Sequence, residues 1–263
     1  MHTAKRILSI DFDYFQQVTM ENLSAYPNST DNDTSLSEYA WGSIYGALSA
    51  ASDLIRQVKI RKDEFDAMKA IIRNQKAGVP VMITNSHRDI YDFIHCHVDE
   101  KETLYLVNID MHHGMIDDRQ VFDTHILNCG NWISFICREY KTDLTWIANP
   151  VSSEMYSLDK FETLKKPDCI IPSSVNVIRD IQFDAIFLCR SDTWTVPHLD
   201  KYFSSLGNSA VKHFKNVYIE RNILKPRKEY LEIAKECARL TQQAMPNNKT
   251  YKRSRKPISQ YKT

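Results

Sequence analysis

The sequence predicts an α/β protein with three layers (αβα), in which helices cover both faces of a mainly parallel sheet. Short, almost wholly apolar segments alternate along the chain with helical segments, a pattern typical of parallel sheets buried on both faces. Polar residues follow the ends of four of the apolar segments. Because the carboxyl ends of parallel strands meet at one edge of the sheet, we expect these polar residues to lie together.

Length and composition exclude several classes of protein. The chain has 263 residues, 43% of them hydrophobic and 25% charged, which is enough for a full core. A formal net charge of +1 gives no field that favours nucleic acid. None of the six cysteines forms a Cys-x-x-Cys pair, which indicates reduced thiols and a cytoplasmic protein. We expect no signal peptide and no membrane partner, since no apolar run approaches the roughly 18 residues of a membrane helix.

Six short apolar runs account for the predicted sheet. Each is bounded by polar or turn-forming residues, which favours a buried strand over a helix. In chain order the predicted strands are residues 7–10, 79–84, 103–109, 144–148, 183–189 and 217–219. Residues 169–171 add a short buried piece.

Helices are predicted between the strands, where apolar residues recur at helical spacing. Asp63 is the expected N-cap of the second helix and Gly78 its stop signal. In chain order the predicted helices are residues 38–58, 63–76, 90–97, 129–140, 155–165, 196–206 and 227–243.

Two polar segments stand apart from this pattern. Residues 16–37 have no apolar period and are expected to form a long loop, either a lid over a site or a floppy insertion. Residues 245–263 carry several lysines and arginines and no acid, and are expected to form a mobile basic tail. Residues 1–244, which include the loop 16–37, are expected to form a single domain.

The strongest chemical signal lies at the end of the third strand, in the run VNIDMHHG over residues 107–114. Residues two apart in an extended chain point to the same side, so Asp110 and His112 are expected to project together. A carboxylate oxygen beside an imidazole suits Mn, Zn or Fe.

Further candidate ligands follow two other strands. The full set is Asp11, Asp13, His87, Asp110 and His112. Three carboxylates and two imidazoles are enough to hold two Mn²⁺ ions, and two metals about 3.5–4 Å apart share a water and lower its pKa towards neutrality.

Each candidate also has a structural interpretation. Asp11 and Asp13 can form a turn and a helix cap, and His87 can begin a helix. His113 is either a support for the site or a catalytic proton carrier. The run 95–97 (HCH) looks like a zinc cluster, but on a predicted helix its side chains point in different directions, which favours a structural role.

Several segments together resemble the arginase-type ureohydrolases. LSIDFDYF (8–15) resembles their Ser-x-Asp-x-Asp motif. NIDMHHG (108–114) resembles their Asp-x-His-x-Asp motif and the Asp-x-His-His-Gly run of the histone deacetylases, which share the fold. VMITNSHRDIYDFI (81–94) is similar to the segment that carries the family's first metal histidine, and CGNWISFI (129–136) to a pattern in a less studied branch. The chain most resembles the peptide arginases, which use Mn²⁺ to convert arginine side chains of natural-product precursor peptides to ornithine, releasing urea.

The resemblance implies a role for each candidate residue. The first metal falls to His87, Asp110 and Asp11, and the second to His112, Asp110, Asp11 and Asp13. Asp13 or His113 is the expected proton relay. An arginine-containing precursor peptide is the implied partner, and its guanidinium needs a carboxylate. Asp192, after the strand 183–189, is the first choice for that carboxylate and Glu154 the second; Asp192 is alternatively a further metal ligand, as in the deacetylases.

Two departures from the family pattern keep other functions open. The Ser-x-Asp-x-Asp segment lies at the amino terminus instead of late in the chain, which implies a circularly permuted strand order. Gly114 stands where the last Asp of the second motif belongs, so water, Asn85 or Asp117 must substitute, or only one metal binds. The alternatives are a single-metal amide hydrolase similar to the deacetylases and a non-catalytic peptide-binding member of the fold. Nothing in the sequence indicates an oligomeric state.

Overall fold

The computed structural model describes residues 4–27, 34–46, 50–115, 126–156 and 174–227, together with Glu232, Lys235 and Arg239. Four expectations lie wholly or mostly outside the described residues: the buried piece 169–171, the helices 155–165 and 227–243, and the basic tail 245–263. Asp117, a candidate substitute ligand, also lies outside them.

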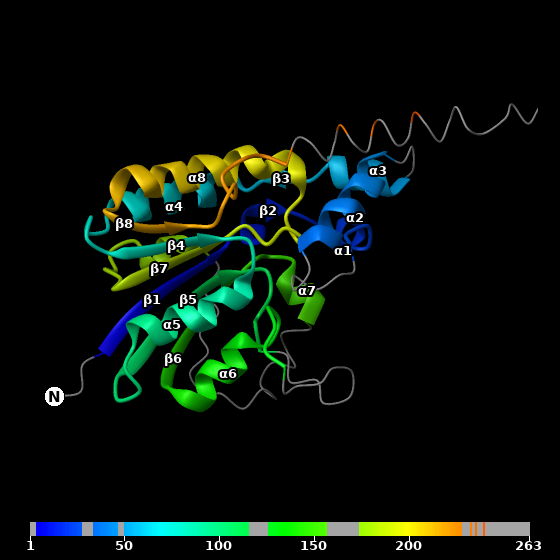
Figure 1. Ribbon diagram of the computed structural model, residues 1–263. Coiled ribbons are helices and arrows are strands. Elements are labelled where there is room, and N and C mark those ends of the chain that lie inside the picture. The colour runs from blue at the N-terminus through cyan, green and yellow to red at the C-terminus, as the bar shows by residue number, and fades with distance from the viewer. Residues whose placement is uncertain are drawn as a thin grey trace, which may run out of the picture.

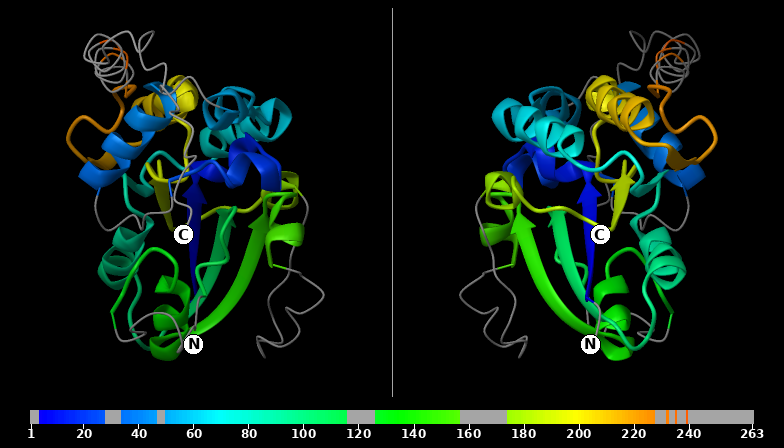
Figure 2. Two further views of the ribbon diagram at one scale, coloured as in Figure 1. Left: turned by 90° about the vertical axis from the view of Figure 1, so that its right-hand side faces the viewer. Right: turned by 90° about the vertical axis from the view of Figure 1, so that its left-hand side faces the viewer.

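A six-stranded, all-parallel sheet forms the middle layer, in the order β6-β5-β1-β7-β4-β8 (Figure 1). The predicted α/β class is therefore confirmed. The bounds are β1 (Ala4–Asp11), β4 (Pro80–Thr84), β5 (Thr103–Asp110), β6 (Lys141–Ala148), β7 (Ala185–Cys189) and β8 (Asn216–Ile219). Figure 2 shows β1, β5 and β6 side by side with their arrowheads at the same end, where the carboxyl ends of the strands gather.

Helices cover both faces of the sheet, which explains why the central strand β7 is buried at every residue. On one side lie α4 (Lys62–Arg73) and α8 (Asp200–His213), and on the other α5 (Ile90–His97) and α6 (Trp132–Glu139) (Figure 1). Successive residues of β1 enter different cores: Leu8 packs with α4 and α8, whereas Ile7 packs with α5 and α6. This alternation makes Ser9 and Asp11 face the same side as Ile7.

The remaining described elements lie outside the sheet and the four helices named above. The helices are α1 (Met20–Leu23), α2 (Thr34–Gly46), α3 (Ala50–Arg56) and α7 (Ser152–Tyr156), with 3-10 turns η1 (Phe12–Phe15), η2 (His87–Asp89), η4 (Val175–Ile178) and η5 (Pro197–Leu199). A separate two-stranded antiparallel ladder joins β2 (Gln16–Gln17) to β3 (Lys59–Ile60). No helix among the described residues is both long and apolar enough to cross a membrane.

The loop expected over 16–37 is wrong over residues 16–27 and 34–37, and residues 34–37 belong to α2. Residues 16–27 contain β2 and α1, and the side chains of Gln16 and Tyr26 are buried. Thr19 and Asn22 form a capping box that starts α1, so local hydrogen bonds replace the missing apolar period. The Tyr26 hydroxyl donates to Gln16 Oε1 at 3.2 Å, which ties the segment to the core.

Several helix boundaries also differ from expectation. The helix predicted over 196–206 is the turn η5 followed by α8, which ends at His213. The helix predicted over 38–58 consists of α2 and α3, with residues 47–49 between them outside the described part. In α4 the N-cap is Arg61, which makes no capping hydrogen bond, and Asp63 lies in the first turn. A carboxylate there still favours the helix, because the amino-terminal end carries a partial positive charge.

Candidate metal centre

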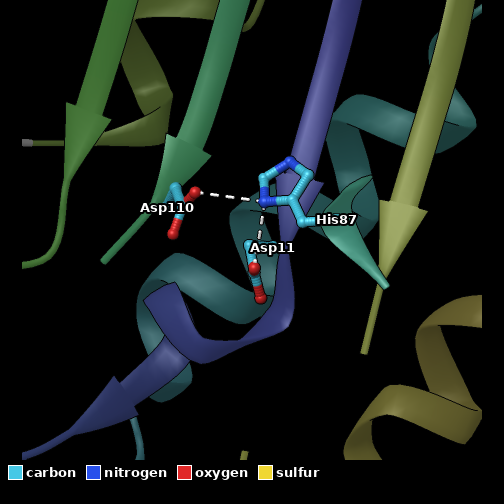
Figure 3. A group of neighbouring side chains, drawn as sticks. All are labelled: Asp11, His87 and Asp110. Carbon is cyan, nitrogen blue, oxygen red and sulfur yellow. Dashed lines mark ion pairs between the residues drawn. The ribbon is translucent and has the colours of Figure 1, made fainter. Parts of the chain in front are cut away.

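Side chains from three strands converge at the carboxyl edge of the sheet (Figure 3). Asp11 and Asp110 are the last residues of the neighbouring strands β1 and β5. His87 begins the 3-10 turn that follows β4, and reaches the two carboxylates across the end of β7. Asp13 and His112 follow β1 and β5 two residues later. The structure thus brings together all five ligands predicted from the sequence.

The first ligand group consists of Asp11, His87 and Asp110, all buried. His87 Nδ1 lies 3.1 Å from Asp11 Oδ2 and 3.2 Å from Asp110 Oδ2. On the other side of the ring, Nε2 is 2.7 Å from Ser9 Oγ. The ring centroid of Phe187 lies 5.7 Å from that of the imidazole, in a stacked arrangement, and the ring centroid of Trp132 lies 4.9 Å from it. One hydroxyl and two aromatic rings therefore fix the orientation of His87.

The second ligand group consists of Asp13, Asp110 and His112. His112 Nδ1 lies 2.8 Å from Asp13 Oδ2 and 3.6 Å from Asp110 Oδ1. Asp110 therefore belongs to both groups, as predicted for a bridging carboxylate. The Met111 N–H donates to Asp13 Oδ1 at 3.0 Å and the His112 N–H donates to Asp110 Oδ1 at 2.7 Å, which orients both acids.

Asp11 does not join the second group, in contrast to the expected bridging role. Its Oδ1 accepts the N–H of Asp13 at 3.2 Å, because Asp11 is also the N-cap of η1. Its Oδ2 faces His87. Oδ1 of Asp11 thus caps η1, while Oδ2 is in position for the predicted ligand role.

The spacing of the ligand atoms in the first group fits a metal ion, whereas the 2.8 and 3.6 Å distances from His112 Nδ1 in the second group lie on either side of the expected range. Two atoms that each lie about 2.1 Å from one ion are roughly 3.0–3.4 Å apart at octahedral or tetrahedral angles. The distances from His87 Nδ1 fall in this range. Asp13 Oδ2 has no hydrogen-bond partner although it lies 2.8 Å from His112 Nδ1, and His112 Nε2 is a second buried atom without one. Buried polar atoms without partners are costly, and a cation between the ligands offsets that cost.

The electrostatics of the cluster favour a cation as well. Burial, with the charges of Asp13 and Asp110, raises the pKa of Asp11 to about 7. Burial and the charge of Asp110 raise the pKa of Asp13 to about 6. Burial also opposes ionisation of Asp110, but contacts with His112 and His87 outweigh it and lower the pKa of Asp110. Burial lowers the pKa of His87, but its contacts with Asp11 and Asp110 raise it to about 10. Without a metal, protons bound to these side chains supply the positive charge that the buried carboxylates need.

His113 lies beside the cluster and is a member of neither ligand group. Its Nδ1 accepts the N–H of Met115 at 2.9 Å, and its ring packs 4.5 Å from that of Tyr156. Burial and the charge of His112 lower the pKa of His113 to about 4, so the imidazole is neutral near pH 7.

The structure does not support Asp192 as the carboxylate for a substrate guanidinium, and the role of Glu154 stays a prediction. Both oxygens of Asp192 accept hydrogen bonds from Arg190, one of them, from Nη2, at 2.9 Å. Arg227 Nη1 lies 3.5 Å from the same carboxylate. Asp192 is also absent from both ligand groups among the described residues. Glu154 lies on α7 with its side chain exposed.

Gly114 cannot simply be read as a lost ligand. Its φ of +63° disfavours any residue with a side chain, and a Cβ there would lie 3.0 Å from Trp132 Nε1. The backbone and the packing therefore both favour glycine at position 114.

Asn85, a candidate substitute for the missing ligand, uses its Oδ1 to accept the N–H of Asp192 at 3.2 Å.

Sequence reasoning missed the residues that support the ligands. Ser9 could have been found, because it lies two residues before Asp11 on the same face of the strand. Trp194, whose ring lies 4.4 Å from that of His112, carries no local signal. The run 95–97 lies on α5 as expected, and in the described part of the chain it joins no ligand group.

Comparisons of this chain with protein-family models, with curated proteins and with solved structures find no match. The functional assignment must therefore rest on the site itself.

Proposed function

We propose that this chain is a Mn²⁺-dependent hydrolase that converts arginine side chains of a peptide to ornithine, releasing urea. One observation carries the proposal: two Asp/His ligand groups share Asp110 at the carboxyl edge of a parallel sheet. Active sites of such sheets lie at this edge. The resemblance of residues 8–15, 81–94 and 108–114 to the ureohydrolases supports this reaction class.

Asp11, His87 and Asp110 would hold one ion, and Asp13, Asp110 and His112 the other. A pair of divalent ions supplies Lewis acidity that activates water and stabilises negative charge. Imidazole and carboxylate ligands together suit Mn²⁺, though Zn²⁺ and Fe²⁺ accept the same atoms.

The reaction also needs proton transfer by the protein. Water adds its oxygen to the guanidinium carbon, the bond from that carbon to the side-chain nitrogen breaks, and this nitrogen gains a proton. Asp13 or His113 would carry this proton. Oδ2 of Asp13 lies beside His112 in the second ligand group, and Nδ1 of His113 accepts the N–H of Met115.

The test is to load the protein with Mn²⁺ and incubate it with an arginine-containing peptide. Urea should form, and each converted arginine should lose one carbon, two nitrogens and two hydrogens by mass spectrometry. Asp110→Asn should abolish both signals, and Asp143→Asn, a change on β6 outside the ligand groups, should retain them. An unchanged peptide in the presence of protein with bound ions contradicts the proposal.

A single-metal amide hydrolase is the second candidate, and the packing at Gly114 favours it. Because glycine stands at this strained position, the group with Asp11 and His87 has three protein ligands among the described residues. Metal analysis separates the candidates: two ions per chain support the first, and one ion with activity on acyl-lysine peptides supports the second.

A further inference from the structure

His112 is the most exposed of the five candidate ligands, and Trp194 lies against it. The side chain of His112 is 17% exposed, whereas those of Asp11, Asp13, His87 and Asp110 are 4% exposed or less. We take the His112 side as the side from which a substrate reaches the cluster. The half-buried ring of Trp194 lies 4.4 Å from the His112 ring.

The loop that carries Trp194 is held on both sides. Arg227 donates from Nη1 to the Asp192 carbonyl at 2.8 Å and from Nη2 to the Thr195 carbonyl at 2.7 Å. Gln16 Nε2 donates to the carbonyl of Trp194 itself at 2.6 Å. Asp192, expected to bind substrate, thus anchors this loop through its arginine partners.

Charge explains why an aromatic face is useful here. Two divalent ions and three carboxylates leave a small net positive charge, which does not attract a guanidinium. The carboxylate of Asp192 is bound to arginines and Glu154 is exposed on α7. An indole face binds a planar cation through its quadrupole without adding a charge to the metal ligands.

We infer that Trp194 is the substrate-binding platform for a planar cation, the arginine side chain, at the mouth of the metal centre. This inference rests on the proposed function for the identity of the substrate. It makes Trp194 the residue that distinguishes arginine from a neutral side chain of the same shape. The clamped backbone gives the ring one position before substrate arrives, which reduces the entropic cost of binding.

The test compares two peptides, acetyl-Ala-Arg-Ala-amide and its citrulline counterpart, on Mn²⁺-loaded protein by calorimetry. Citrulline keeps the shape and loses the charge. In Trp194→Leu we expect binding of the arginine peptide to weaken about 3- to 30-fold, with citrulline binding unchanged. Trp194→Phe, which keeps an aromatic ring, should lose less. Tyr218→Leu, which removes a 64% exposed ring on β8, should change neither peptide.

Metal analysis of each variant shows whether the centre is intact, and if Trp194→Leu loses its ions the comparison rests on Trp194→Phe. Three results would overturn the inference. In the first, the variants lose affinity for both peptides equally; in the second, their affinity for the arginine peptide is unchanged. In the third, the wild-type protein binds the arginine and citrulline peptides with the same affinity. Trp194-dependent arginine binding without urea release upholds the platform and refutes the proposed reaction.

Discussion

Asp110 is the residue on which both ligand groups depend. It is the last residue of β5, its carbonyl accepts the indole N–H of Trp146 at 3.0 Å, and its two oxygens face different histidines. Asp11 serves one group only, because its other oxygen caps η1. The two acids therefore differ in what their loss removes.

We predict that Asp110→Asn lowers bound Mn²⁺ from two ions per chain to none, and that Asp11→Asn lowers it to one. Amide oxygens lack the charge that holds divalent ions, so each substitution should affect only the groups that it touches. Metal content after gel filtration measures this, with Asp143→Asn as the control. Two tightly bound ions in Asp110→Asn would show that the ligand groups are assigned wrongly.

Gly114 gives a second prediction. Gly114→Asp restores the residue of the related motif, but we expect it to lower the free energy of unfolding by about 1–3 kcal/mol, because φ is +63° and Trp132 and Ile133 surround the site. Urea denaturation measures the change. Gly78→Ala, with nothing within 4 Å of the new Cβ, should be nearly neutral. A Gly114→Asp protein of full stability with tighter metal binding would contradict this account.

At the scale of elements, a buried charge network joins the end of β7 to the start of α8. Arg227 Nη2 lies 2.7 Å from Asp200 Oδ1, and Arg190 Nη1 donates to the carbonyl of Ile223 at 2.8 Å. Asp192 completes the network. Removing one member of a buried ion pair leaves its partner's charge uncompensated.

We predict that Asp192→Asn lowers the free energy of unfolding at pH 7 by about 3–5 kcal/mol. Burial opposes the charge of Asp192, but Arg227 and Arg190 outweigh it and lower its pKa. Its contribution is therefore complete above the unfolded pKa of about 4 and is lost as pH falls through the lower folded value. Urea titrations of the variant and wild type should converge in acid. Asp66→Asn, in an exposed pair with Lys62, should cost under about 1 kcal/mol, and an equal cost would refute the role of the network.

The sequence predicts the secondary-structure elements better than it predicts the contacts within the site. The helix predicted over 90–97 matches α5, and each predicted strand coincides with a strand of the sheet, because apolar period is a local property. The contact of Ser9 with His87 joins residues 78 apart, and that of Trp41 with the Asp192 carbonyl joins residues 151 apart. Such contacts depend on strand order, which local patterns do not contain. Asp192 shows both cases, since Arg190 lies two residues away whereas Arg227 lies 35 residues away, and without these contacts the sequence alone predicts a substrate role for it.

At the scale of the whole molecule, metal binding should couple to stability. An ion that binds only the folded state stabilises it by about 2.7 kcal/mol when present at 100 times its Kd. Protons compete for the same atoms, since the pKa of Asp11 is about 7 and that of Asp13 about 6. We predict that Mn²⁺ raises the unfolding temperature strongly at about pH 8 and much less at about pH 5.5, and that a chelator reverses the effect. A shift independent of pH would mean that the ion binds elsewhere.

Because Asp110 belongs to both ligand groups, two ions held there would not bind independently. A first ion would withdraw electron density from the shared carboxylate and add positive charge beside it, so a second ion would bind more weakly. If the proposed reaction needs both ions, the protein would be inactive at metal concentrations that fill only the tighter position. Its output would follow the supply of free metal in the cell, as a graded response set by a single side chain.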